Sequence, residues 1–332
     1  MELHEFGPDD VGSVDTFVAI TAACDEQDCP WEVPLTRASV QRDLRFGWDG
    51  ELPRYFLLRD GGTDVGTLCY YGSERDNPEL AWVDLKIRPE RRRAGLGRAA
   101  ADAVFRFCRE HGRPLVILER GWDSPAVRGF AASLDFPLAQ VTVRRVQELT
   151  GDAAETARFT ALRAEAEEHS GGYDLVRVLG RTPPELLDGL VAVTEAINDA
   201  PHDDLEYNDE AYDVDRIRLF EQAQADAGFR LHRVLAVERA TGAVAGHTVL
   251  SVYGDQPQFA EQDDTTVLGE HRGHRLGLRL KADMLCWLAE TEPQVRRILT
   301  ENAESNDPMI AVNERLGYTI AGRQLLHQRR LD

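Results

Sequence analysis

The 332-residue sequence has no long run of apolar residues, and its first residues are acidic rather than basic. A membrane-spanning helix needs about 20 predominantly apolar residues. A secretory signal needs a basic stretch followed by an apolar one. We therefore expect a protein that does not enter the membrane and that resides in the cytoplasm.

Cysteine is scarce, since the chain has five cysteines. Apart from Cys24 and Cys29 they are scattered, and no second close pair completes a metal site. His271 and His274 have a spacing seen in metal sites, but Glu270 is the one nearby residue that could add a ligand. The sequence therefore predicts reduced, mostly buried thiols and no metal ion.

Basic residues are in the minority, with 38 Lys and Arg against 58 Asp and Glu and a net charge of −20. Nucleic-acid binding rests mainly on neutralising phosphates, so this balance disfavours it. The negative field favours the approach of cationic molecules instead. No Gly-x-Ser-x-Gly segment is present, which leaves an esterase without support.

The chain contains an internal repeat. Its length suggests two domains. Each half is predicted to start with a strand and helices, followed by a hairpin (residues 54–71 and 231–252), a third strand, a glycine-bearing loop and a helix. Gly66 matches Gly246, and Leu96-Gly97 matches Leu276-Gly277, both at an offset of about 180 positions. Matches in the same order, at the same predicted elements, indicate a duplicated domain.

The best candidate for a linker is a charged, helix-prone segment that ends in Ser170-Gly171-Gly172. We therefore expect an N-terminal domain at residues 1–154, a linker helix at 155–172 and a C-terminal domain at 173–332. Each domain is expected to be α+β, with a mixed, mostly antiparallel sheet flanked by helices. Antiparallel hairpins at the start argue against a dinucleotide-binding fold.

Each half has a loop between a predicted strand and a predicted helix that is suited to hold a pyrophosphate. Residues 91–97 read RRRAGLG, and residues 271–277 read HRGHRLG. Such a loop directs backbone N–H groups at one point, where the helix dipole adds positive charge. Glycine lets the backbone approach a phosphate closely, and arginines add charge-assisted hydrogen bonds.

These loops resemble the Gln/Arg-x-x-Gly-x-Gly/Ala motif of the GNAT superfamily of N-acetyltransferases. The first copy matches fully, whereas in the second Arg275 takes the place of the first glycine. The resemblance covers almost the whole chain and implies a tandem GNAT protein whose sheets splay to admit the pantetheine arm of acetyl-CoA. It implies that the cofactor is held by Arg92, Arg93, Ala94, Gly95, Leu96, Gly97 and Arg98, and by Arg272, Gly273, His274, Arg275, Leu276 and Gly277.

A second GNAT-like motif lies downstream, at residues 300–306 (TENAESN) and at Gly317-Tyr318. By resemblance, Asn302 and Asn306 would lie near the CoA arm, although Asn306 is equally suited to cap the helix that follows. Many family members have a tyrosine four residues before this glycine as a general acid. Asn313 stands there in the second half and Ala131 in the first. Tyr318 is a substitute candidate, but nothing in the sequence singles it out.

A general base is expected on the third strand of each half, eight or nine residues before the loop. Asp84 stands there in the first half, and Asp263 and Asp264 in the second. The alternative is a strand-end carboxylate that faces solvent. Because successive strand residues face opposite sides, at most one of Asp263 and Asp264 is expected in the cleft. An acidic segment beyond the second half's first helix offers His202, Asp203, Asp204 and Glu206 for the acceptor, or is a solvated loop.

The sequence thus predicts transfer of an acetyl group from acetyl-CoA to a primary amine of a small, cationic molecule by direct attack. The C-terminal domain is expected to be catalytic and the N-terminal one degenerate. Two alternatives remain open: an acyl-CoA-binding protein without catalysis, and an acetyltransferase for proteins or peptides. The oligomeric state is expected to be a monomer or homodimer.

Overall fold

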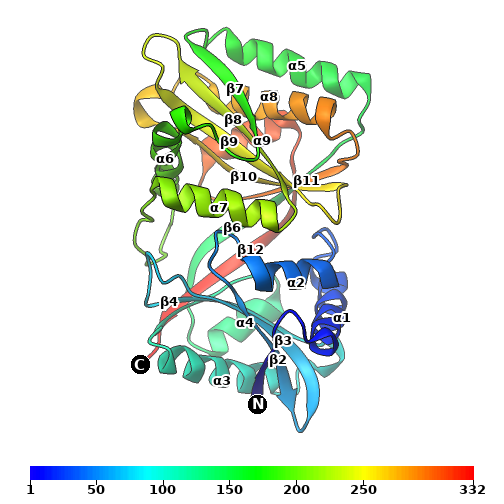
Figure 1. Cartoon of the computed structure of the whole chain (residues 1–332). Coiled ribbons are helices and arrows are strands. Elements are labelled where there is room, and N and C mark those ends of the chain that lie inside the picture. Colours follow the sequence, from blue (N-terminus) through cyan, green and yellow to red (C-terminus); the bar gives the residue numbers. More distant parts are fainter. The chain divides into compact units, whose positions relative to one another are not determined.

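The computed structural model describes residues 1–332 and divides the chain into two units that interleave along the sequence. Unit 1 comprises Met1–Val143, His202–Asp209 and Gly322–Asp332. Unit 2 comprises Arg144–Pro201 and Glu210–Ala321. Each is a mixed, mostly antiparallel sheet flanked by helices (Figure 1), which confirms the predicted fold class.

Unit 1 has its sheet strands in the order β1-β2-β3-β4-β5, and the end of β12 pairs antiparallel with β5. The strands are β1 (Glu2–Glu5), β2 (Arg54–Asp60), β3 (Thr63–Tyr71), β4 (Leu80–Ile87), β5 (Leu115–Leu118) and β12 (Thr319–Arg330). The helices are α1 (Val11–Asp28), α2 (Arg37–Phe46), the short η1 (Pro89–Arg91), α3 (Leu96–Glu110) and α4 (Pro125–Ser133).

Unit 2 repeats this order, with the sheet running β7-β8-β9-β10-β11 and then to β6. Its strands are β6 (Leu138–Glu148), of which the part from Arg144 belongs to this unit, β7 (Tyr173–Leu179), β8 (Arg230–Glu238), β9 (Val244–Val252), β10 (Phe259–Val267) and β11 (Arg297–Ala303). Its helices are α5 (Ala153–Glu167), η2 (Pro184–Leu186), α6 (Leu187–Glu195), η3 (Ala196–Asp199), α7 (Val214–Asp226), η4 (Gly269–His271), α8 (Leu276–Thr291) and α9 (Asp307–Leu316).

The unit boundaries differ from the division at residues 155–172 that the sequence suggested. The helix expected as a linker, α5, belongs to unit 2. Its residues Phe159 and Ala166 are buried in the hydrophobic core around α8. Unit 1 takes its last strand from the C-terminal end of the chain, since Arg330 pairs with Leu115 and His327 with Leu118. Which strand completes a sheet depends on pairing between segments distant in sequence, and no local pattern records it.

Both sheets splay between their two parallel strands. In unit 1, β4 pairs with β5 from Leu80 to Val83, and its later residues up to Ile87 pair with β3 only. In unit 2, β10 pairs with β11 over Phe259–Glu261, after which the hydroxyl of Thr300 donates to the carbonyl of Gln262 at 2.9 Å. The later residues of both strands therefore border an opening in the sheet, as expected for the pantetheine arm.

The duplication extends to single residues. Gly66 faces Ile87 across β3 and β4, and Gly246 faces Val267 across β9 and β10. A Cβ atom would come within 2.3 Å of a backbone carbonyl oxygen at position 66 and within 2.7 Å of one at position 246. Both matched glycines are thus required by the same close approach of two strands.

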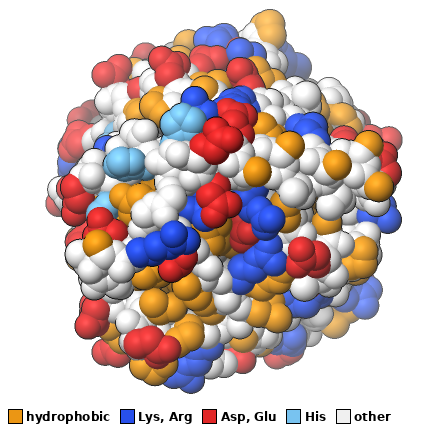
Figure 2. All heavy atoms as spheres, turned by 90° about the horizontal axis from the view of Figure 1, so that it is seen from above, with side chains coloured by type: hydrophobic (Ala, Val, Ile, Leu, Met, Phe, Trp, Pro, Cys, Tyr) orange, Lys and Arg blue, Asp and Glu red, His pale blue; other side chains and the backbone are white.

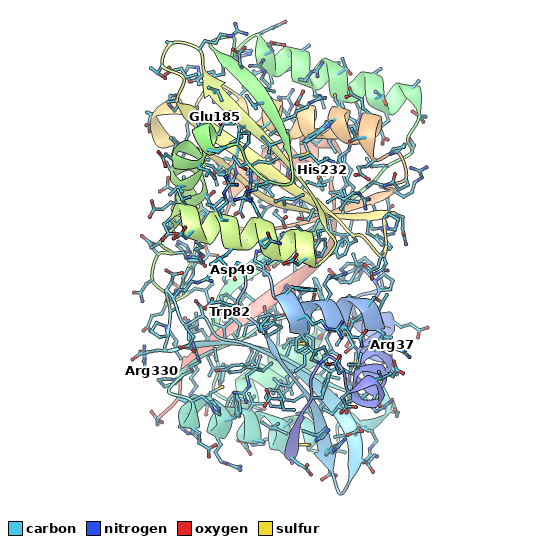
Figure 3. The ribbon with its side chains drawn as sticks, viewed as in Figure 1. Arg37, Asp49, Trp82, Glu185, His232 and Arg330 are labelled. Atoms are coloured by element: carbon cyan, nitrogen blue, oxygen red, sulfur yellow. The ribbon has the colours of Figure 1, made fainter.

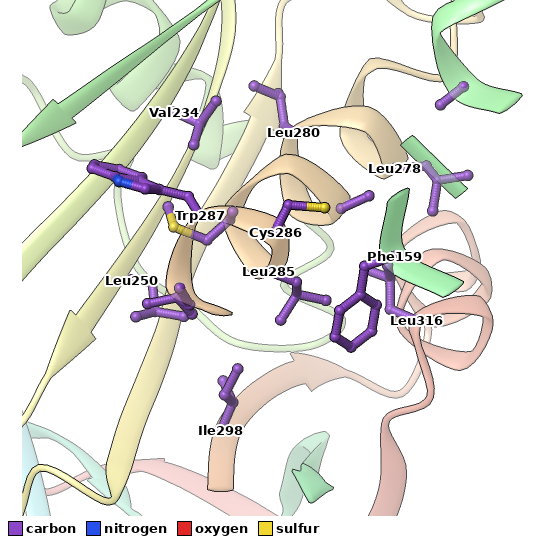
Figure 4. Close-up of a cluster of buried hydrophobic side chains, with 14 of the residues drawn as sticks. Phe159, Val234, Leu250, Leu278, Leu280, Leu285, Cys286, Trp287, Ile298 and Leu316 are labelled. Atoms are coloured by element: carbon purple, nitrogen blue, oxygen red, sulfur yellow. The ribbon is translucent and has the colours of Figure 1, made fainter. Parts of the chain in front are cut away.

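The core of unit 2 surrounds α8, which is buried on nearly all sides between the sheet and α5. Figure 4 shows Phe159 of α5 beside Leu316 and Leu285, with Trp287 turned towards the strands. Arg163 of α5 binds Asp283 of α8 at 2.9 Å, and Arg177 of β7 binds the same carboxylate at 2.8 Å. The α5 segment therefore contributes both apolar contacts and ion pairs to this unit.

Candidate active site

The two predicted phosphate loops have the same backbone path. Each holds two residues in the left-handed region, Arg93 (φ 65°) and Gly95 (φ 80°) in unit 1, and Gly273 (φ 87°) and Arg275 (φ 55°) in unit 2. Arginine and glycine have exchanged places between the copies, and Arg275 accepts a conformation that costs an L-residue about 1 kcal/mol. Gly95 and Arg275 precede α3 and α8 without a side-chain cap, so first-turn N–H groups remain for an anion.

One arginine of each loop, Arg92 or Arg272, is held by the protein itself. The Nε of Arg92 donates to the carbonyl of Ile87 at 3.0 Å, and its Nη groups bind Asp28. Arg272 repeats this arrangement with the carbonyl of Val267 at 3.0 Å and with Asp199 at 2.5 Å. Arg92 and Arg272 therefore help to fix the shape of each loop.

The other loop residues take different roles. Leu276 is buried in the core of unit 2, Leu96 packs against the core of unit 1, and Arg275 pairs with Glu165 at 2.6 Å. The His274 ring lies 5.9 Å from that of Tyr173, measured between centroids. Ala94 is exposed beside Gly95.

The helix after each loop starts in different surroundings. A Cβ on Gly97 would lie 3.2 Å from the ring of Phe130 on α4, and Arg98 donates to the Ser133 carbonyl at 2.6 Å. In unit 2, a Cβ on Gly277 would meet nothing within 4 Å. Space beside the first helical turn is therefore open in unit 2 and narrowed by α4 in unit 1.

A β-bulge lies at the carboxylate pair of β10. Gln262 is opposite Leu250 and Thr265 is opposite Thr248, so Asp263 and Asp264 together oppose Val249. Arg233 of β8 is also opposite Val249, and both carboxylates act on its pKa. A bulge interrupts the regular pairing at these two residues, since two of them oppose one. That at most one of the two carboxylates faces the cleft stays a prediction. Both carboxylates interact with the same buried guanidinium.

The surroundings of these carboxylates raise their pKa values. Burial, together with the nearby Glu210 charge, raises the pKa of Asp264 to about 6, against the opposing effect of Arg233. Burial and the charges of Glu261 and Asp264 raise the pKa of Asp263 well above its ordinary value, although Ser251 donates to it at 3.0 Å. A carboxyl group that titrates near neutral pH is suited to accept a proton from an amine.

Asp84, the matching candidate in unit 1, lies beside an ammonium group. The Nζ of Lys86 is 3.5 Å from Asp84 and 2.8 Å from Asp25. Burial raises the pKa of Asp84, while Lys86 acts in the opposite direction. This carboxylate therefore already has a cationic partner within the protein.

Comparison with known proteins fits this geometry. A family model described as "Acetyltransferase (GNAT) family" matches residues 20–136 and 194–318. The chain belongs to the GNAT acetyltransferase family. It is accordingly an N-acetyltransferase that carries its fold twice, and this confirms the resemblance inferred from the two loops.

Solved structures agree. A tandem GNAT protein from the clavulanic acid biosynthesis pathway is 27% identical, with a TM-score of 0.78, covering 99% of this chain and 98% of that one. A GCN5-related N-acetyltransferase from Sphaerobacter thermophilus is 16% identical, with a TM-score of 0.69, covering 99% and 95%. The second likeness concerns the fold alone. A search of curated protein sequences found no match to the chain.

The downstream GNAT motif lies on β11 and α9. Asn306 caps α9, where its side chain accepts from the Met309 N–H at 3.3 Å, which confirms the capping interpretation. Asn302 lies on the part of β11 beyond its pairing with β10. Tyr318 is buried, its hydroxyl has no hydrogen-bond partner, and burial raises its pKa. A buried phenol of raised pKa is a weak acid, so the structure offers no support for its role as proton donor.

The acidic segment expected near the acceptor belongs to unit 1. The backbone N–H and carbonyl of Glu206 bond to the side chain of Gln328 at 2.6 and 2.7 Å, and its carboxylate binds Arg330 at 2.9 Å. Arg330 lies near the C-terminal end of β12 (Figure 3). The N–H of Asp204 bonds to the Ala139 carbonyl at 3.0 Å, Asp203 has a φ of 49°, and the His202 ring packs edge-on against Tyr207. Their role with an acceptor stays a prediction.

Sequence reasoning missed several buried polar residues of this GNAT enzyme. Arg233 is 2% exposed and donates to Thr182 and Glu221. His247 is 1% exposed, neither ring nitrogen has a partner, and burial lowers its pKa to about 3. Lys281 stands on the apolar face of α8, three residues after Leu278 and four before Leu285. Its position in the apolar pattern of this helix could have predicted a buried lysine from the sequence.

One face of the molecule carries side chains of both charges. On the face drawn in Figure 2, acidic and basic side chains are interspersed. None of the helices combines the length and the apolar composition that a membrane span requires. No group of three or more His, Cys, Asp or Glu side chains is arranged to hold a metal ion.

Proposed function

We propose that unit 2 is the catalytic half, and that it transfers an acetyl group from acetyl-CoA to a primary amine with Asp264 as general base. The observation that carries this proposal is the position of Asp264. It stands in a bulge beside the opening of the sheet, with a pKa of about 6.

Acetyl-CoA fits the features of this opening. The uncapped start of α8 offers N–H groups to the pyrophosphate, and the space beside Gly277 leaves room for it. The pantetheine arm then runs between β10 and β11, where the two strands no longer pair. Asn302 and Asn306 border this path from β11 and the start of α9.

The proposed reaction is a direct attack. The amine nitrogen bonds to the thioester carbon while Asp264 takes its proton, directly or through water. Collapse of the tetrahedral intermediate breaks the carbon–sulfur bond and releases CoA. In this proposal, backbone N–H groups at the bulge of Asp263 and Asp264 stabilise the oxyanion.

The acceptor in this proposal is a small cationic amine. Four carboxylates, from Glu210, Glu261, Asp263 and Asp264, lie near one another here. Glu210 is paired with Arg216 and Glu261 with Arg144, which leaves Asp263 and Asp264 with the single guanidinium group of Arg233. This remaining excess of carboxyl groups favours a positive ligand. That the tandem GNAT protein of similar length comes from the clavulanic acid biosynthesis pathway supports a small-molecule acceptor.

Unit 1 is proposed to be a degenerate partner. Phe130 narrows the space beside Gly97, and Lys86 pairs with Asp84. Both features work against a second active site.

Isothermal titration with acetyl-CoA tests the binding of the cofactor, on which the rest of the proposal depends. One molecule bound per chain is the expected result. Two bound molecules would contradict a degenerate unit 1, and no binding at millimolar acetyl-CoA would overturn the proposal. A panel of diamines, aminoglycosides and basic peptides, read by CoA release, then tests the acceptor class. Turnover of peptides alone would contradict the small-molecule assignment.

A further inference from the structure

A chain of three polar side chains crosses the buried part of unit 2. The Nζ of Lys281 on α8 donates to Oδ1 of Asn313 on α9 at 2.6 Å. The Nδ2 of Asn313 donates to Oδ1 of Asn302 on β11 at 2.7 Å. Lys281 is 2% exposed and Asn313 is fully buried, while Asn302 is half-buried.

The fold does not require these hydrogen-bonded side chains, as unit 1 shows. At the aligned positions unit 1 has Ala101 on α3 and Ala131 on α4, both buried in its apolar core. The same helices therefore pack around the same sheet without a polar group. Burial lowers the pKa of Lys281 to about 7, because the charged form is disfavoured away from water. A costly group that one copy lacks points to a role in function.

The protonated form of Lys281 sets the direction of these hydrogen bonds. An ammonium group has donors and no acceptor, so it binds the oxygen of the Asn313 amide. The NH₂ of Asn313 then points to Asn302 and binds its oxygen. The NH₂ of Asn302 is left over, and the structure gives it no partner. Since Asn302 stands on the part of β11 beyond its pairing with β10, that NH₂ group is available at the opening between these two strands.

We propose that Lys281 and Asn313 are positioning residues that fix Asn302 as a hydrogen-bond donor to a carbonyl oxygen of the pantetheine arm. This inference rests on the proposed binding of acetyl-CoA by unit 2. Without the orienting lysine, the Asn302 amide is equally free to present its oxygen, which repels a carbonyl.

Asn313→Asp tests the orientation while keeping the volume of the side chain. An aspartate at 313 accepts from Lys281 and also from Asn302, so the Asn302 amide turns and presents its oxygen to the opening. Asn302→Leu removes the donor altogether, and the double variant Asn313→Asp/Asn302→Leu completes the cycle. Acetyl-CoA affinity is measured by isothermal titration, and the melting temperature is measured for each protein.

Each single variant is expected to bind acetyl-CoA about two- to tenfold more weakly than the wild type, the range of one neutral hydrogen bond. The double variant is expected to bind no more weakly than Asn302→Leu, because Asn313 acts through Asn302. Asn313→Asp is expected to melt no lower than the wild type, since Lys281 gains a carboxylate. A structural role alone would leave the affinity unchanged.

Unchanged affinity of Asn313→Asp, or additive losses in the double variant, would overturn this inference while the proposed function stands. Additive losses would indicate that the added negative charge acts directly on CoA. Lys281→Met, alone and with Asn302→Leu, gives an independent reading with the same expected pattern. A wild type that binds no acetyl-CoA would overturn the proposed function and this inference together.

Discussion

The ring of Phe130 lies against Gly97, so that a Cβ at position 97 would come within 3.2 Å of it, whereas the equivalent Gly277 borders open space. The two glycines occupy the same position of one motif, at the second residue of α3 and of α8. Separate substitutions at Gly97 and Gly277 therefore test which loop binds the cofactor.

Gly277→Val is expected to weaken acetyl-CoA binding and lower turnover by roughly 10- to 100-fold, because the side chain projects into the space proposed for the pyrophosphate. The variant is expected to fold, since nothing within 4 Å opposes the new Cβ. Gly97→Val is the matched control and should leave turnover close to that of the wild type. Wild-type turnover in Gly277→Val would place catalysis outside unit 2.

Asp264→Asn is expected to lower kcat/KM by about 10²- to 10⁴-fold, the usual contribution of a general base. With its pKa at about 6, the wild-type carboxylate is protonated in acid, so the rate should rise with pH through about 6 and then level off. Stopped assays of CoA release between pH 5 and 9 check both points. Asp84→Asn serves as the control in unit 1, and an equal loss there would contradict the assignment.

Gly246→Ala is expected to reduce the free energy of unfolding by about 1–3 kcal/mol, because its Cβ would come within 2.7 Å of the Thr266 carbonyl oxygen. Urea unfolding measures the change. Gly269→Ala is a suitable control, since a Cβ there meets nothing within 4 Å. Equal stability of the two variants would show that β9 and β10 separate easily at this point.

Much of the fold was predictable because its signals are local. The left-handed positions at Gly95 and Gly273 and the hairpins of both halves follow from turn chemistry and periodicity. The bulge at Asp263 and Asp264 was not predictable, because it depends on which β9 residue each one faces. The addition of residues 322–332 to unit 1 likewise depends on distant pairing.

The candidate site divides in the same way. The phosphate loops were recognisable from their sequence, since backbone N–H groups and a helix start need little more than glycine spacing. The contact between Lys281 and Asn313 was not predictable, because it depends on how α8 and α9 pack against each other. Likewise, the ion pair of Lys86 with Asp84 could be found only in the structure. It is this pair that distinguishes Asp84 from Asp264 as a candidate base.

The pKa of Asp264 also predicts how stability changes with pH. Its folded value of about 6 lies above the value of about 3.9 for an unfolded chain, so folding favours the protonated carboxyl. This contribution is complete below about pH 4 and is lost as the pH rises through about 6.

Above pH 7, therefore, Asp264→Asn is expected to be about 1–3 kcal/mol more stable than the wild type, because the amide carries no charge to bury. Near pH 4 the difference should shrink towards zero. Urea unfolding at pH 4, 6 and 8 measures it, and Asp188→Asn, an exposed position on α6, controls for the change in net charge. A variant that is inactive and yet more stable at pH 8 would indicate that the enzyme sacrifices stability to keep a base of this strength in place. Lower stability of Asp264→Asn at pH 8 would contradict the raised pKa, and the proposal of Asp264 as the base would lose its main physical argument.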